Sequence, residues 1–192
     1  MRFIFSLTCF AMLLNCSSPC DNMTFPRSDT SPYVLPYPVG EERQLSQSYC
    51  SPWGHKNRLA YDFQMEIGAP ITNSRPGVVV ETISTYSDHD HQPGHNNRVV
   101  VKHTDGTMGW YAHLQQGSII VEKGDSVEYG DTLGACGQSG RAGAIPHLHF
   151  EVFKSKLYHY SDAMPITFSN IEGLNNYNHV LKSRVPLKAR PY

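Results

Sequence analysis

Short runs of apolar and aromatic residues alternate with turn-forming residues through the middle of the chain. Three runs rich in valine and aromatic residues predict strands over residues 78–83, 98–103 and 107–114. Asp105-Gly106 separates the last two runs and is a strong signal for a hairpin turn. Since no stretch has the period of a long amphipathic helix, we predict a mainly β chain.

The segment that follows residue 120 has neither a helical nor an alternating pattern. Apolar residues and glycines recur there every three residues, at Val121, Gly124, Val127, Gly130 and Leu133. This spacing predicts short β segments separated by tight turns, in which glycine adopts backbone angles that other residues resist. The rest of the chain, from residue 153 to residue 192, has mixed polarity and predicts a wrapping tail with one strand at Met164–Phe168.

The stretch "AIPHLHFEV", residues 144–152, combines apolar residues with two histidines. In an extended strand, residues two apart point to the same face. His147 and His149 therefore share one face, and Leu148 and Phe150 lie on the other. Two interpretations stay open from this pattern alone: a polar strand face satisfied by its neighbours, or a pair of imidazoles that does chemistry.

Composition supports a single β-rich domain and limits the partners. The chain has 192 residues, enough for one domain with a core, and its 15 Gly, 13 Pro and 11 Tyr favour many turns. Its 16 Lys and Arg against 17 Asp and Glu give a formal net charge of −1. That balance argues against a nucleic-acid partner and against electrostatic binding to anionic membranes.

The first residues predict an export signal. The apolar run Phe3–Leu14 is too short to span a bilayer as an ordinary helix. It ends in "LLNCSS", which resembles the lipidation motif of bacterial lipoproteins, although Asn15 departs from the usual small residue. We therefore expect residues 1–15 to be a lipoprotein signal peptide and Cys16 to carry a membrane anchor. The alternative is an ordinary secretion signal; either interpretation exports the protein.

Residues 16–32 are polar, with several serines and prolines, and we expect a flexible tether that ends where the domain begins, near Tyr33. An exported protein can form disulfides. Apart from Cys9 and Cys16, the cysteines are Cys20, Cys50 and Cys136. Cys50 and Cys136 both lie in the folded part, so we expect them to pair; the alternative is that both are small buried apolar residues.

Ten histidines are many for this length: His55, His89, His91, His95, His103, His113, His147, His149, His159 and His179. A hydrolytic zinc site commonly takes three protein ligands and keeps one position for water, whose pKa falls to roughly 7. It also needs unligated groups that move protons or stabilise an oxyanion. Two imidazoles on one strand face supply both needs. The helical HExxH motif of many zinc proteases does not occur.

Three segments together resemble one family. They are "HKNRLAYDFQMEIGAPITNSRPGVVV", "RVVVKHTDGTMGWYAHL" and "VEKGDSVEYGDTLGACGQSGRAGAIPHLHFEV". In this combination, and with "LPYPVGEERQLSQSY" before them, the chain resembles the lysostaphin/LytM-type zinc metallopeptidases, which cut peptide bonds in bacterial peptidoglycan. The resemblance implies a small antiparallel β-sheet or barrel-sandwich domain over residues 33–155, with a groove holding one zinc ion, followed by a tail at 156–192.

The resemblance also implies roles for particular residues. Its zinc ligands correspond to His55, Asp62 and His149, and its unligated catalytic histidines to His113 and His147. Many members of the family place the first histidine and the aspartate four apart; here they are seven apart, so the sequence departs from the family pattern at His55. We expect a zinc endopeptidase acting on peptidoglycan peptides, and the sequence leaves the oligomeric state open.

Other interpretations compete with these assignments. His89, His91 and His95 form either a solvated loop or a substitute or second metal site. Glu151, on the same face as His147 and His149, either orients a metal ligand or is a solvated strand residue. At the level of the whole protein, the alternatives are a non-catalytic lipoprotein that binds the wall or regulates other hydrolases, and a metal-carrier lipoprotein.

Overall fold

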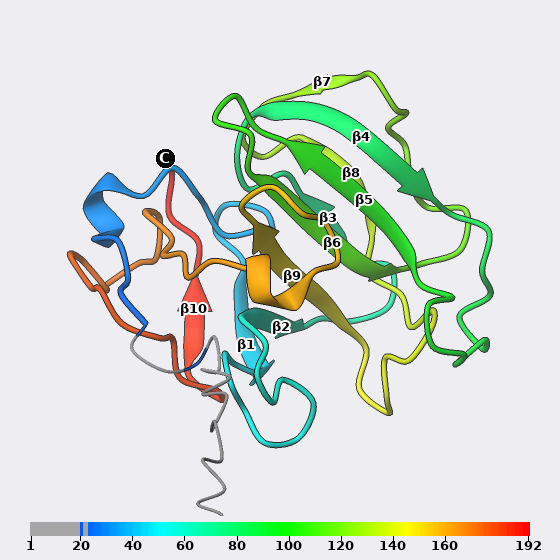
Figure 1. Cartoon of the computed structure of the whole chain (residues 1–192), viewed down its shortest axis with the longest axis horizontal. Coiled ribbons are helices and arrows are strands. Elements are labelled where there is room, and N and C mark those ends of the chain that lie inside the picture. The colour runs from blue at the N-terminus through cyan, green and yellow to red at the C-terminus, as the bar shows by residue number, and fades with distance from the viewer. Residues whose placement is uncertain (1–19, 21–22) are drawn as a thin grey trace, which may run out of the picture.

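The computed structural model describes residue 20 and residues 23–192. The signal peptide and the anchor expected at Cys16 lie outside the described residues. Ten strands form in the described part (Figure 1): β1 Glu42–Gln47, β2 Ala60–Gln64, β3 Pro70–Thr72, β4 Gly77–Ile83, β5 Asn97–Lys102, β6 Met108–Leu114, β7 Ser126–Val127, β8 Thr132–Ala135, β9 His147–Phe153 and β10 Pro186–Lys188. The helical elements there are two short 3-10 turns, η1 Ser28–Thr30 and η2 Tyr160–Asp162.

The strands build two antiparallel sheets. The larger sheet has the order β10-β1-β2-β9-β6-β5-β4-β7, and β3 pairs with β8 in the smaller one. Figure 1 shows β4, β5, β6 and β9 side by side, with β10 next to β1 at the other end of the large sheet. The mainly β, antiparallel class is confirmed. Within residues 20 and 23–192, no helix has the length and apolar character needed to cross a membrane.

The strands predicted from valine-rich runs are confirmed as β4, β5 and β6, with Gly106 at a positive φ of 87° in the turn of the β5–β6 hairpin. The three-residue repeat also forms as predicted. It contains the short strands β7 and β8, with Gly124 and Gly130 at φ angles of 107° and 78° in the turns. These positive angles carry a steric penalty for residues with a Cβ atom.

The strand expected at Met164–Phe168 does not form. Tyrosine side chains take up backbone donors of this segment: Ile166 N–H donates to the Tyr49 hydroxyl at 3.2 Å and Phe168 N–H to the Tyr177 hydroxyl at 2.6 Å. Pro165 has no N–H to offer. Met164 N–H still donates to the Val152 carbonyl of β9 at 2.9 Å, but beyond it tyrosine hydroxyls take the place of a strand partner, which hydrophobic patterning does not reveal.

Strand β9 lies at the centre of the large sheet, between β2 and β6, and all of its side chains are buried. Leu148, Phe150 and Val152 face the hydrophobic core. The Phe150 ring lies 4.9 Å from Tyr111 and 6.1 Å from Phe168, so residues from β6 and from the C-terminal segment pack on the same apolar face. This packing fixes which face of β9 is left for the histidines.

Residues 23–32, expected to belong to a flexible tether, pack against the C-terminal segment. Ser28 is buried, and its N–H donates to the Tyr177 carbonyl at 2.9 Å. The Ser31 hydroxyl donates to the Thr167 carbonyl. Figure 1 shows this N-terminal segment, in blue, beside the orange and red C-terminal segment. A backbone N–H and a side-chain hydroxyl of this segment are thus paired with residues more than 100 positions away in the chain.

The expected disulfide between Cys50 and Cys136 is wrong. Cys50 pairs with Cys20, whose Cα atom lies 5.9 Å away. Cys136 directly follows β8; it is a free, fully buried thiol whose Sγ lies 3.9 Å from the Met65 carbonyl. Burial raises its pKa to about 12. The N-terminal segment that was expected to be a tether therefore supplies the partner of Cys50.

We predict that Cys50→Ser lowers the free energy of unfolding by about 3 kcal/mol, because the cross-link restricts the unfolded chain. Cys20→Ser removes the same bond and should show the same loss in denaturant unfolding. A reducing agent should destabilise the wild type and leave both variants unchanged. Non-reducing peptide mapping should link Cys20 to Cys50, with Cys136 unalkylated until the protein unfolds; a Cys50–Cys136 peptide would contradict this.

Candidate metal centre

Two central strands bring Asp62 and His149 together. In the β2–β9 register Asp62 lies directly opposite His149, and His147 lies opposite Gln64. Residues directly opposite in an antiparallel pair project to the same face. The Asp62 carboxylate and the two histidines therefore share the face of the sheet that points away from Phe150 and the core. Nδ1 of His149 lies 2.8 Å from Oδ1 of Asp62, within hydrogen-bond distance.

His55 reaches the same carboxylate from the loop that precedes β2. Its ring is buried, and its Nε2 lies 3.1 Å from Oδ2 of Asp62. Its Nδ1–H donates to the Ser48 carbonyl at 3.0 Å. A carbonyl oxygen only accepts, so this bond places the proton on Nδ1 and turns the Nε2 lone pair toward Asp62. The loop between His55 and β2 accommodates the seven-residue spacing between His55 and Asp62, which is longer than the four of many family members.

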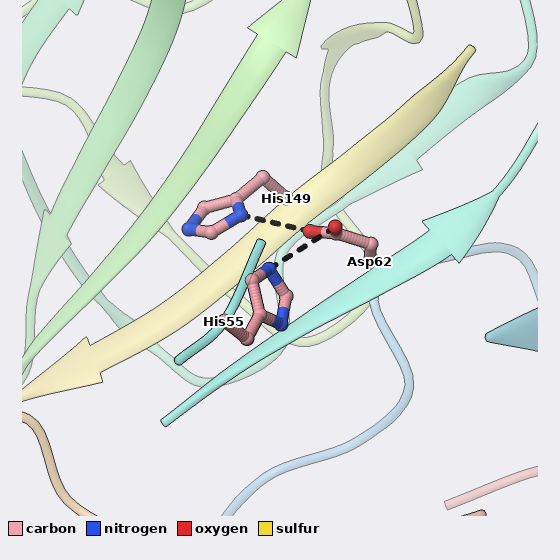
Figure 2. A group of neighbouring side chains, drawn as sticks. All are labelled: His55, Asp62 and His149. Carbon is pink, nitrogen blue, oxygen red and sulfur yellow. Dashed lines mark hydrogen bonds and ion pairs between the residues drawn. The ribbon is translucent and has the colours of Figure 1, made fainter. Parts of the chain in front are cut away.

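His55, Asp62 and His149 form a compact and buried donor set. One nitrogen of each histidine and one carboxylate oxygen lie within 4.8 Å of one another, and no other such group of three occurs among the described residues. Figure 2 shows the two imidazoles directed at the Asp62 carboxylate, His149 from β9 and His55 from the loop. Imidazole nitrogens and a carboxylate oxygen are ligands that zinc prefers.

His147 lies beside this set with its own proton fixed. Its Nδ1–H donates to the Ile145 carbonyl at 2.7 Å, and its Nε2 lies 3.6 Å from Oδ2 of Asp62. The backbone carbonyl therefore gives His147 the same tautomer as His55. An Nε2 lone pair that faces a reaction site is suited to accept a proton.

His113 reaches the site through a β-bulge. Asn97 and Arg98 on β5 pair with Leu114 and Ala112 on β6, so His113 is an extra residue, and its φ is 66°. Simple alternation along β6 places His113 on the core face; the bulge turns its ring toward His147 and His149, at centroid distances of 4.9 and 5.9 Å. Its Nδ1–H donates to the Ser139 carbonyl at 2.7 Å.

The electrostatics of the site follow from burial and from the close histidines. Burial raises the pKa of Asp62, but the surrounding histidines, His147 first and then His149 and His55, outweigh it and hold the pKa well below its usual range. Burial and then the neighbouring His147 and His149 lower the pKa of His113 to about 3. Asp62 is therefore ionised and His113 neutral at physiological pH.

Glu151 and Arg58 complete the surroundings of His149. Glu151 has 1% of its surface exposed, so its interpretation as a solvated strand residue is wrong. Arg58 Nη2 donates to Oε2 of Glu151 at 2.8 Å and lies 2.9 Å from Nε2 of His149. The sequence did not identify Arg58 as a site residue, because no motif marks it. Arg58 lies two residues before β2, and its contact with Glu151 is evident only in the folded chain.

The remaining histidines lie outside the centre. His89 and His91 are exposed, and His95 stacks on Tyr86 at 4.5 Å while its Nδ1 pairs with Asp90 at 2.8 Å. None of the three belongs to the close donor set found in the described part of the chain. His103 is buried at the end of β5, where its Nδ1–H donates to the Pro76 carbonyl at 3.0 Å, and burial lowers its pKa to about 4.

Comparison with known proteins places this arrangement in a class, the metallopeptidases, and then in one family. The model of peptidase family M23 matches residues 56–161, which include Asp62, His113, His147 and His149. The chain belongs to peptidase family M23. The resemblance to lysostaphin/LytM-type peptidases that the motifs indicated is thereby confirmed.

Several characterised proteins share this domain. The chain is 40% identical over 122 residues to peptidoglycan DD-endopeptidase ShyA of Vibrio cholerae, covering 60% of this chain and 26% of that protein. It is 30% identical over 118 residues to glycyl-glycine endopeptidase ALE-1 of Staphylococcus capitis, covering 61% and 30%. The structure of lysostaphin from Staphylococcus simulans superposes with a TM-score of 0.52 at 28% identity, covering 64% and 47%. The chain thus spans about a quarter to a third of the two enzymes' lengths.

We predict that His103 makes stability depend on pH. Its folded-state pKa of about 4 lies below the unfolded value near 6.5, so the unfolded chain binds the proton first as pH falls. The free energy of unfolding should drop between pH 6.5 and 4, in total on the order of 3 kcal/mol at about 1.4 kcal/mol per pKa unit. Urea unfolding of His103→Gln should lack this component, and the exposed control His89→Gln should keep it. Equal pH slopes for wild type and His103→Gln would contradict the assignment.

Proposed function

We propose that this protein is a zinc-dependent endopeptidase that hydrolyses peptide bonds in the stem or cross-bridge peptides of peptidoglycan. The observation that carries the proposal is the site itself: a buried His55–Asp62–His149 donor set with the Nε2 atom of His147 beside it. Membership of family M23 and similarity to the peptidoglycan DD-endopeptidase ShyA and the glycyl-glycine endopeptidase ALE-1 support the substrate class.

The residues present fit one zinc ion. Two imidazole nitrogens and one carboxylate oxygen make three ligands, the number typical of hydrolytic zinc sites. The Ser48 carbonyl already fixes the proton of His55 on Nδ1, which leaves Nε2 free as the ligand atom. When bound, zinc supplies Lewis acidity: it polarises a carbonyl oxygen and makes water a stronger nucleophile at neutral pH.

His147 and His113 are the groups for proton transfer and oxyanion stabilisation. Both donate Nδ1–H to a backbone carbonyl, Ile145 and Ser139 respectively, so each ring is held in orientation while its Nε2 is free. A neutral imidazole takes a proton from the attacking water at Nε2 and, once protonated, donates a hydrogen bond to the developing oxyanion or a proton to the leaving amine.

No observation favours the non-catalytic alternatives. A wall-binding relative that had lost activity would lack one or more of the five site residues, and all five are present here. A metal carrier would use several clusters, whereas the close donor set of the described residues is single and excludes His89, His91 and His95.

The proposal predicts that the protein releases cleaved peptides from isolated sacculi. A chelator should abolish hydrolysis, and zinc added back should restore it. His149→Ala should lose zinc and activity together, since it removes a ligand. His147→Ala should keep about one zinc ion per chain, because the ligands remain, while activity falls by roughly 10²-fold or more.

Elemental analysis and mass spectrometry of the released peptides are the two measurements. His113→Ala should behave like His147→Ala, and His55→Ala and Asp62→Ala like His149→Ala. Loss of zinc from His147→Ala with retention in His149→Ala would reverse the roles. Absence of hydrolysis by the wild type at full zinc occupancy would refute the endopeptidase and leave the binding protein as the function.

The location follows from the same proposal. Peptidoglycan lies outside the cytoplasmic membrane, so the protein must be exported, and "LLNCSS" supports an anchor on Cys16. We predict that Cys16→Ala loses lipid labelling and moves from the membrane fraction to the soluble exported fraction. The matched control Cys9→Ala, within the expected signal, should fractionate like the wild type. Identical fractionation of Cys16→Ala and wild type would exclude the anchor.

A further inference from the structure

The four histidines of the site are oriented by two different kinds of partner. His55, His113 and His147 each donate Nδ1–H to a backbone carbonyl, so each turns Nε2 toward the centre. His149 is reversed: its Nδ1 lies 2.8 Å from Oδ1 of Asp62, and its Nε2 points outward. Both ring nitrogens of His149 contact side chains, and no backbone carbonyl among the described residues contacts them. Side chains must therefore set the tautomer of His149.

The chemistry of a ligand determines which tautomer His149 needs. A histidine that gives its Nδ1 lone pair to a metal carries its proton on Nε2, and that proton requires an acceptor. Two side chains lie at Nε2: Arg58 Nη2 at 2.9 Å and Oε2 of Glu151 at 3.4 Å. A guanidinium only donates. Glu151 is therefore the group at this position that can accept the proton.

Unpartnered atoms at the same place support this role. Oε1 of Glu151 and Nε of Arg58 are both buried without a hydrogen-bond partner, while Oε2 alone takes up the Arg58 contact. A side-on pair, with Nε on Oε1 and Nη2 on Oε2, would satisfy both atoms, take Nη2 off Nε2 of His149 and leave the second lone pair of Oε2 for the His149 proton. The Arg58 guanidinium lies 4.1 Å from the centre of the Tyr160 ring, which keeps it close to Glu151.

We propose that Glu151 is a positioning residue of the metal centre: its carboxylate accepts the Nε2 proton of His149 and so presents the Nδ1 lone pair to the metal, with Arg58 compensating the buried charge. The inference rests on the proposed zinc site. It adds a residue that touches neither metal nor substrate, and it explains a buried carboxylate on β9 that the fold does not require. A buried charge is costly unless a partner compensates it, and an apolar side chain at this position would avoid the cost.

The test measures zinc affinity and not hydrolysis. In the full chain, Glu151→Gln should weaken zinc binding about 10- to 100-fold in competition with a chelator of known affinity, because an amide oxygen is a weaker acceptor than a carboxylate. Glu151→Met, which leaves no strong acceptor, should weaken it further. At saturating zinc both variants should still bind one ion per chain, and Glu151→Gln should regain most of its hydrolysis.

Glu81→Gln is the matched control. It breaks another Arg–Glu pair, in which Arg98 Nε donates to Oε1 of Glu81 at 2.6 Å on β4 and β5, and Glu81 has no hydrogen bond or ion pair with a site histidine among the described contacts. This variant should keep the wild-type zinc affinity. A purely structural Glu151 would instead lower the stability of the metal-free protein and leave the zinc dissociation constant within twofold of the wild type, a result that overturns the proposal.

A second measurement needs no variant. In the zinc-bound wild type, ¹⁵N NMR of the imidazoles should show His149 protonated at Nε2 and its Nδ1 shifted by the metal. Protonation at Nδ1 would overturn the proposal even if Glu151→Gln failed to fold. The two claims fail separately: zinc binding without hydrolysis by the wild type refutes the endopeptidase, whereas equal zinc affinity of wild type and Glu151→Gln refutes the positioning role.

Discussion

A single buried carboxylate, that of Asp62, organises the site. It has 1% of its surface exposed and would be costly to bury as an ion without compensation. Nδ1 of His149 lies 2.8 Å from one of its oxygens, and His55 and His147 approach the other at 3.1 and 3.6 Å. The β2–β9 register and the course of the loop before β2 both serve to assemble these contacts. The same charge and geometry that stabilise the histidines make a site for a divalent cation.

The site is precise because backbone carbonyls hold most of its rings. Ser48, Ile145 and Ser139 each accept a proton from one histidine, and each carbonyl belongs to a loop fixed by the adjoining strands. Ring orientation and tautomer are then determined before any ligand binds, which lowers the cost of reorganisation during reaction. His149 is held instead by side chains, and this difference gave Glu151 and Arg58 a role beyond packing.

Segments outside the domain expected at residues 33–155 contribute to the same structure. Residue 20 is bonded to Cys50, near the loop that holds His55, and β10 adds an edge strand to β1. Tyr158, in the segment after β9, lies against Trp110, whose ring is 5.1 Å from that of His149. Segments before residue 33 and after residue 155 therefore contact the surroundings of the centre.

The sequence by itself determined the fold class, the central strands, the hairpin at Asp105-Gly106 and the family, because these depend on local patterns of apolar, turn-forming and motif residues. It also proposed the five site residues, four of them within the segment that matches the family model. It failed where contacts between distant segments decide the outcome. The Cys20–Cys50 bond, the packing of residues 23–32 and the tyrosine hydroxyls that replace a strand at Met164–Phe168 are all long-range pairings.

The placement of individual side chains shows the same division. Alternation correctly put His147 and His149 on one face, since the period of a regular strand is local. Alternation along β6 would have sent His113 into the core, and only the bulge opposite Asn97 and Arg98 turns it to the site. Arg58 and Glu151 lie 93 positions apart in the chain, and no local pattern joins them. Local propensity determined the strands and turns. Which distant residues come into contact was decided by the need to compensate buried charges and to pair buried hydrogen-bonding groups.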